Sequence, residues 1–141
     1  MPNFRQNADG TLGIQGSQLD DGAFITMAFQ YDAASVDRSF FLAQRPYVVK
    51  GIIVRPAVAG TDAGAVTVTI KKAASGTAIA SGTALHSGTA NLKSTIHTNQ
   101  TLTLSTTASD LQIAAGDGVG CDFTGTMTAA VGCVTVLMAP S

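Results

Sequence analysis

The sequence contains no glutamate and no tryptophan, and only 12% of its 141 residues are charged. An ordinary soluble domain has about a quarter of its residues charged. Because glutamate is one of the strong helix formers, its absence removes much of the usual material of long helices. Alanine, threonine, glycine, serine and valine dominate instead. This mixture favours short strands joined by tight turns, and we predict an all-β protein.

Concentrated positive charge and long hydrophobic runs are also missing. The eight basic residues are dispersed and the net charge is −1, so no patch could neutralise many phosphates, and we expect no nucleic-acid partner. The segment MPNFRQNADG lacks the features of a signal peptide, and no run of about 18 apolar residues occurs, so we expect neither export nor a membrane partner. A nearly neutral chain has little charge repulsion to prevent self-association, and this favours a protein that functions as part of an assembly.

Two regions differ in pattern. Residues 1–22 are rich in Gly, Gln, Asn and Asp without a sustained hydrophobic period, and we predict an extended N-terminal arm. Residues 23–141 carry eight or more short apolar or alternating runs bounded by turn residues, which predicts a β-sandwich of jelly-roll type. The candidate strands are 24–31, 39–43, 47–55, 65–72, 101–105, 110–114, 119–124 and 131–138.

Alternate residues along a strand point to opposite faces, so the odd or even position of each residue (its parity) separates a core face from an outer face. In AVTVTIKK, Val66, Val68 and Ile70 share one face, and Thr67 and Thr69 share the other. YVVKGIIVR and VGCVTVLM are apolar on both parities, as central strands covered on both faces or strands at an interface would be.

The residues offer little for catalysis. His86 and His97 stand alone in Ser/Thr-rich segments without metal-ligand spacing, and we expect both to be solvated surface histidines. The sequence has no Gly-x-Ser-x-Gly elbow and too few His and carboxylate residues for a cupin-like metal enzyme. We therefore predict no catalytic residues and no enzyme activity.

The acidic and glycine-rich segments are explained by turns. Asp20-Asp21 precedes a glycine, and Asp117 lies in AAGDG, where a short side chain can bond the backbone of its own turn. The glycine-rich segment 116–120 leads into a predicted strand and not into a helix, so it does not predict a phosphate site. No ordered calcium-binding series is present. We predict no cofactor and no metal site.

Two cysteines, Cys121 and Cys133, invite a disulfide interpretation. Without an export signal, thiols are more often free, and we favour two small buried hydrophobes. If 118–124 and 131–138 formed a hairpin about residue 127, the two would lie directly opposite each other, so a disulfide stays open.

Phe40-Phe41 raises the question of an interface. Adjacent residues on a strand point to opposite faces, so one ring would be in the core and the other exposed or covered by another segment. An exposed Phe beside arginines suits a protein interface, whereas coverage of both rings by the domain's own arm is the alternative. The candidate partner-binding residues are Phe4, Arg5, Arg38, Phe40, Phe41 and Arg45.

The segments SFFLAQRPYVVKGIIVRPAVAGTDAGAVTVTIKK and TLTLSTTASDLQIAAGDGVGCDFTGT, followed by the apolar final strand, carry a resemblance to a family. Over about residues 38–139, the chain resembles the small cement or decoration proteins of tailed-bacteriophage capsids. The resemblance implies a jelly roll on the capsid exterior, often a homodimer, that bridges major capsid proteins of HK97-like fold. Gly118 and Gly120 depart from the larger side chains expected in that strand, which points to a weakened strand or a close approach there.

From these patterns we expect a structural virion protein, made in the bacterial host cytoplasm, that binds the capsid exterior and stabilises the shell. The arm would act as a tether. The alternative is a fibre or spike domain that binds a host surface glycan or protein, although the lack of tryptophan disfavours glycan binding.

Overall fold

The computed structural model describes the backbone of residues 4–6 and 12–14 and the whole of residues 24–141. Within the described residues, the chain forms strands and two short 3₁₀ helices. The strands are β1 (Phe4–Gln6), β2 (Leu12–Ile14), β3 (Ile25–Tyr31), β4 (Arg38–Leu42), β5 (Tyr47–Val58), β6 (Thr67–Ala73), β7 (Thr83–Ala84), β8 (Ala90–Asn91), β9 (Gln100–Thr101), β10 (Gln112–Ile113), β11 (Gly118–Thr124) and β12 (Val131–Pro140). The 3₁₀ helices are η1 (Ile79–Ser81) and η2 (Ala108–Leu111).

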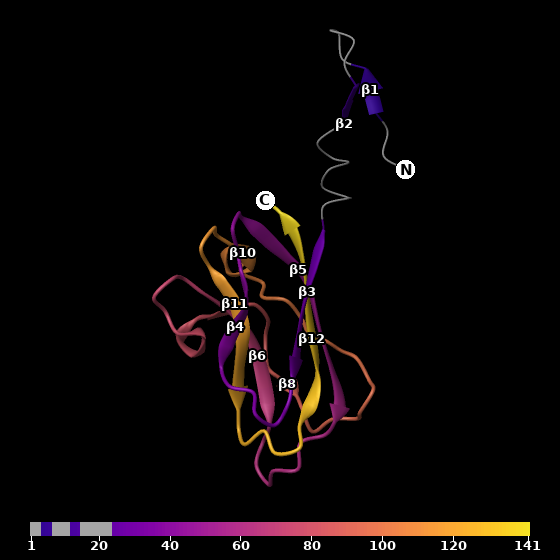
Figure 1. Ribbon diagram of the computed structural model, residues 1–141, viewed down its shortest axis with the longest axis vertical. Helices are drawn as coiled ribbons and strands as arrows, with labels where there is room; N and C mark the ends of the chain where they lie inside the picture. Colours follow the sequence, from indigo (N-terminus) through magenta and orange to yellow (C-terminus); the bar gives the residue numbers. More distant parts are fainter. Residues whose placement is uncertain (1–3, 7–11, 15–23) are drawn as a thin grey trace.

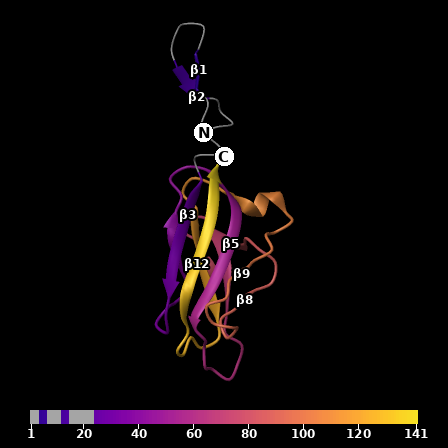
Figure 2. The same ribbon diagram turned by 90° about the vertical axis from the view of Figure 1, so that its right-hand side faces the viewer.

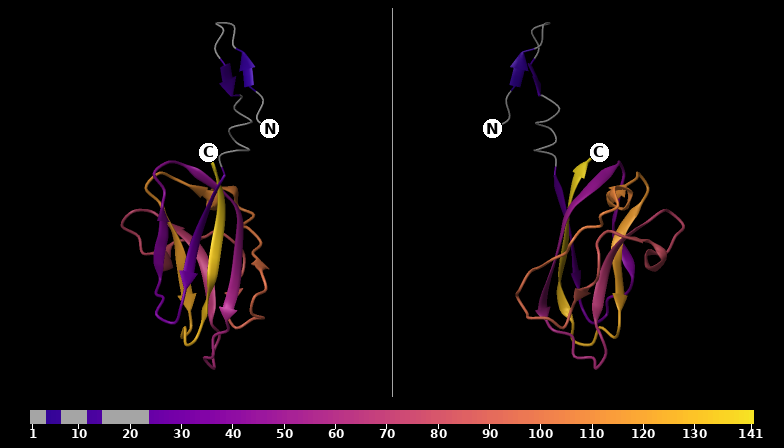
Figure 3. Two further views of the ribbon diagram at one scale, coloured as in Figure 1. Left: turned by 45° about the vertical axis from the view of Figure 1, so that its right-hand side comes forward. Right: turned by 180° about the vertical axis from the view of Figure 1, so that it is seen from behind.

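Residues 24–141 form two antiparallel sheets packed face to face (Figure 1). The first sheet has the order β10-β5-β12-β3, with β9 also paired to β5. The second has the order β4-β11-β6-β7, with β8 also paired to β6. Strands β3 to β6 alternate between the two sheets, as do β11 and β12 (Figure 3). The all-β sandwich is confirmed, and its assignment to the jelly-roll class stays a prediction.

The core lies between the sheets and follows the predicted parity. Val68 and Ile70 of β6 are fully buried, whereas Thr67 and Thr69 alternate with them on the outer side. Burial of one Val or Ile side chain contributes about 1.5–3 kcal/mol, so this alternation fixes which face of each strand turns inward. β12 is hydrogen-bonded to β3 on one edge and to β5 on the other. Every second side chain of β12 therefore points away from the core, on the outer face of the first sheet.

The hairpin about residue 127 that would place the two cysteines opposite each other does not form. Strands β11 and β12 belong to opposite sheets, because the chain crosses the end of the sandwich between them. Cys121 consequently points into the core from the second sheet, and Cys133 lies on the outer parity of the first. Both cysteines are free, as the sequence favoured.

The N-terminal arm contains one element that its composition did not predict. Strands β1 and β2 pair antiparallel with each other, with Arg5 opposite Gly13. Among the described residues, neither strand pairs with the sandwich. The remaining part of the predicted extended arm over residues 1–22 lies outside the described residues.

Candidate functional site

A β-bulge explains where the Phe40-Phe41 pair lies. Along β11, Val119 pairs with Phe41 while the next residue pairs with Ser39, so Phe40 is the extra residue of the bulge. An extra residue changes the facing of its neighbours, and both rings pack against the core. Phe40 stacks on Phe29 with centroids 5.7 Å apart. The expectation that the two rings point to opposite faces, with one exposed or covered by another segment, was therefore wrong.

The other candidate partner-binding residues do not gather around these rings. The Arg38 guanidinium lies over the Phe29 ring, 4.9 Å from its centroid, in a cation–π contact. Arg45 is exposed in the turn that leads to Tyr47. The side chains of Phe4 and Arg5 lie outside the described residues. Among the described members of the set, Phe40 and Phe41 thus pack against the core, Arg38 covers Phe29, and Arg45 is solvated.

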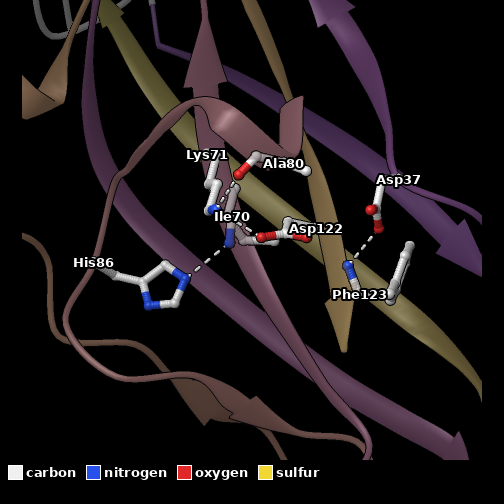
Figure 4. A network of polar contacts seen from close by, with 7 residues as sticks. All are labelled: Asp37, Ile70, Lys71, Ala80, His86, Asp122 and Phe123. Carbon is white, nitrogen blue, oxygen red and sulfur yellow. Dashed lines mark hydrogen bonds and ion pairs between the residues drawn. The ribbon is translucent and has the colours of Figure 1, made fainter. Parts of the chain in front are cut away.

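His86 is buried, contrary to the expectation of a surface histidine, whereas His97 is exposed as expected. The ring lies in the gap between β7 and β8, where β6 has no neighbouring strand. There its Nε2 accepts a hydrogen bond from the backbone N–H of Ile70 at 2.9 Å (Figure 4). Nδ1 must therefore carry the proton, and it faces the carbonyl of Ser87 at 3.2 Å. Burial lowers the pKa of His86, and the Ser87 contact opposes this more weakly.

Part of the outer face of the second sheet is covered by the chain itself. The excursion between β6 and β7 carries η1, which contacts β6 and β11 and buries Ile79 (Figures 1 and 3). Lys71 anchors it, because Nζ lies 2.6 Å from an Asp122 carboxylate oxygen and donates to the Ala80 carbonyl at 2.7 Å (Figure 4). The excursion therefore shields the outer side of β6 and β11 around Lys71 and Asp122, whereas Leu42 of β4 stays exposed.

Side chains also complete the edge of β11. Beyond the last β4 pairing, the Asp37 carboxylate accepts a hydrogen bond from the Phe123 backbone N–H at 2.7 Å (Figure 4). Nearby, a Cβ at Gly120 would collide with the Arg38 carbonyl, and one at Gly118 with the Ser39 side chain. The predicted close approach at the two glycines is thus confirmed.

The two thiols differ in environment. Burial raises the pKa of Cys121 to about 12; the Arg38 charge lowers it by a smaller amount and the Asp37 charge raises it further, so this thiol stays protonated and inert. Cys133 is half-buried on the outer parity of β12.

The outer face of the β3–β12–β5 sheet contrasts with that of the second sheet, because no described segment lies over it (Figure 2). The register places small and apolar side chains side by side there, with Thr135 between Ala28 and Ile53, and Leu137 beside Thr26. Ile53 and Leu137 keep 37% and 36% of their surface exposed. We call this set the bare face: Thr26, Ala28, Gln30, Ile53, Arg55, Cys133, Thr135 and Leu137.

Charge on the bare face is confined to its ends. Arg55 is its one charged member, and Lys50 is exposed at the bulge of β5 beside Leu137, at the opposite end. The centre is uncharged. A surface depleted of charge at its centre, with arginine at its margin, has the composition of a protein interface. The signal in the sequence was the apolar character of β5 and β12 on both parities.

Residues 4–6, 12–14 and 24–141 contain no group of three potential metal ligands. Over the same residues, no helix combines the length and apolar character needed to cross a membrane.

Comparison with known proteins leaves the family of the chain open. No protein-family model and no curated protein matches the sequence. A solved chain from the Bacillus endospore appendages, described as disulfide-linked pili, aligns over 84% of this chain and 86% of its own length, with 17% identity and a TM-score of 0.36. This likeness is too distant to carry an argument.

Proposed function

We propose that the protein is a structural virion component that binds the outer surface of a phage capsid and bridges neighbouring major capsid proteins, which stabilises the shell. The observation that carries this proposal is the bare face, a sheet surface with an uncharged centre and with exposed Ile53 and Leu137. The family resemblance supplies the capsid as the partner, and it also implies a homodimer on the exterior of the virion.

The size of the bare face suits one contact among many. Along β12 the bare face runs from Cys133 to Leu137, which corresponds to roughly 17 Å, and three strands span roughly 15 Å, so the footprint is roughly 250 Å². A stable two-protein complex buries about 800 Å² per partner, so one such contact alone is modest. In a lattice, many copies reinforce one another, and a protein that binds only the assembled shell shifts the equilibrium away from rupture.

The decisive experiment is cosedimentation with capsid shells that lack the protein. The wild-type chain should bind in large copy number, and Thr135→Lys, which places a charge at the uncharged centre, should weaken binding by about tenfold or more. Leu137→Thr should weaken it by a smaller factor. Leu42→Thr is the matched control, because Leu42 is an exposed strand leucine of the other sheet.

Two outcomes would contradict the proposal. If the wild-type protein does not bind such shells, capsid decoration is wrong. If Thr135→Lys folds and binds as well as the wild type, the bare face is not the contact. Sedimentation of the isolated chain tests the homodimer separately.

A further inference from the structure

Among the strands of residues 24–141, β3 has a long outer edge that nothing interrupts. Figure 2 shows β3 at the margin of its sheet, and within the described residues no strand pairs with it on the side away from β12. The other sheet margins are interrupted. Strands β7, β8, β9 and β10 have two residues each, and β4 begins at Arg38 and carries the bulge. Short strands, charge and bulges all keep a sheet edge from pairing with another chain.

Strand β3 has none of these protective features. Its sequence, ITMAFQY, contains no charged residue, no proline and no glycine, and its pairing with β12 runs from Ile25 to Tyr31 without a register shift. Arg38, the charged residue that approaches this strand from β4, lies over the Phe29 ring, which packs against the core. An uncharged and regular edge of this kind favours the addition of a further strand.

The hydrogen-bond pattern identifies the free backbone groups of this edge. The Ile52 carbonyl accepts from the Leu102 N–H, on the side of β5 that faces β9 and not β12. Backbone groups of successive residues point to opposite edges of a strand, so Ile53 faces β12 and forms a hydrogen-bonded pair with Thr135. Val136, the next residue of β12, then faces β3. Continued across β3, this alternation leaves three residues whose N–H and C=O groups point outward: Thr26, Ala28 and Gln30.

These three residues are complementary to themselves under a two-fold axis through Ala28. If two β3 strands pair antiparallel, Ala28 lies opposite Ala28 of the second copy, and Thr26 lies opposite Gln30. Each hydrogen-bonded pair exchanges two bonds, so this register makes about six. A shift by two residues leaves one of the three without a partner in β3. The ladder ends at Asp32, whose N–H and C=O are bonded to Ser35 in their own turn.

We propose that two copies of the chain pair antiparallel through β3, with Ala28 at the two-fold axis, so that β5, β12 and β3 of both copies form one continuous sheet. Residues opposite each other in such a pair point to the same face, so the two bare faces lie side by side on one surface of the dimer. Their joint footprint is roughly 500 Å², twice that of one copy. This inference goes beyond the proposed function, because it depends on the β3 edge and not on capsid binding.

The association is measured by sedimentation velocity of the full chain at up to about 1 mM. We expect a reversible dimer, because an edge contact is smaller than the interfaces of permanent complexes. Amide exchange gives a second readout over the same concentrations. Exchange at Thr26, Ala28 and Gln30 should slow as the concentration rises, whereas exchange at Met27 and Phe29, whose N–H groups face β12, should not depend on concentration.

Two variants of Ala28 should break the pairing. Ala28→Pro removes the N–H at the axis, and Ala28→Lys places two like charges opposite each other, so each should weaken association by about tenfold or more. The monomer should still fold, because this N–H points to solvent on an edge strand, where proline is tolerated. Thr135→Lys is the matched control, because it places the same charge on the same face but on β12, and it should leave the dimer intact.

Disulfide trapping tests the register in a Cys133→Ser background. Two Ala28→Cys copies would have their Cα atoms about 5.5 Å apart, within the range of a disulfide, and should crosslink on mild oxidation. Thr26→Cys alone should not crosslink, because its two copies would lie about 14 Å apart. A mixture of Thr26→Cys and Gln30→Cys should crosslink.

Four outcomes would overturn the proposal. Three are a chain that stays monomeric at about 1 mM, a dimer that Ala28→Pro leaves intact, and a dimer in which Ala28→Cys does not crosslink. The fourth is slow exchange of the three edge amides at every concentration, which would mean that a segment of the same chain covers the edge. No shells enter these measurements, so a failure here is distinguished from a failure of capsid binding.

Discussion

Acidification should destabilise the protein through His86. The neutral ring accepts the Ile70 N–H inside the domain, and the protonated ring could not accept it and would bury a charge. Because burial lowers the pKa of His86 in the folded state, its stabilising contribution is fully present above the unfolded pKa of about 6.5. It is lost as the pH falls from there toward the folded pKa, at a slope of at most about 1.4 kcal/mol per pH unit.

The measurement is urea unfolding of the wild type and of His86→Gln from about pH 8 to about pH 5. Glutamine cannot titrate, and its amide oxygen can still accept the Ile70 N–H. The free energy of unfolding of this variant should therefore change less with pH over that range than that of the wild type. His86→Ala should lose about 1–3 kcal/mol at about pH 8 for the unpaired N–H alone, with a further loss for the cavity, and the difference from the wild type should shrink as the pH falls. His97→Gln, a substitution of the exposed histidine, should follow the wild-type profile. Parallel pH profiles for the wild type and His86→Gln, or an NMR pKa for His86 at or above 6.5, would refute the reasoning.

Three further predictions concern the second sheet and the thiols. Gly120→Ala should cost about 1–3 kcal/mol in urea unfolding, because its Cβ would meet the Arg38 carbonyl, whereas Gly64→Ala, with Asp62 Oδ2 at 3.4 Å, should cost little; equal effects would contradict the packing described. A double-mutant cycle of Lys71→Met and Asp122→Asn should give a coupling of about 1 kcal/mol, with faster amide exchange in η1; a coupling near zero would mean that the pair does not hold the excursion. Iodoacetamide should label Cys133 in the native protein while Cys121 reacts only after unfolding, and rapid labelling of both would show that β11 opens readily.

The parts of the fold that depend on local pattern could be predicted from sequence. The alternation of Val68 and Ile70 with threonines depends on the two-residue period of a strand, and it identified the buried face. The crowding at Gly118 and Gly120 could be anticipated from residue type. The bare face also had a signal, because β5 and β12 are apolar on both parities, although the pattern alone could not distinguish burial from an interface.

The parts that failed depend on contacts between distant segments. Parity placed Phe40 and Phe41 on opposite faces, but one extra residue against β11 turned both toward the core, and no local signal marks that bulge. His86 stands in a segment rich in serine and threonine, and its burial follows from a gap along β6 that exists only in the assembled sheet. The alternative that placed Cys121 opposite Cys133 is excluded, because the two consecutive strands β11 and β12 join opposite sheets.

The contrast between the two outer faces is the strongest structural argument for a partner. On the second sheet, the excursion that carries η1 lies over part of the outer face of β6 and β11, where Lys71 and Asp122 hold it, so this domain covers part of a sheet with its own chain. The β3–β12–β5 sheet contains the longest strand pairing of the domain, yet within the described residues no segment covers it, and Ile53 and Leu137 face outward. Exposed isoleucine and leucine on a sheet face with an uncharged centre favour association over solubility. A face of this kind is expected where another protein completes the burial, and the two cations at its ends would disfavour a basic partner there.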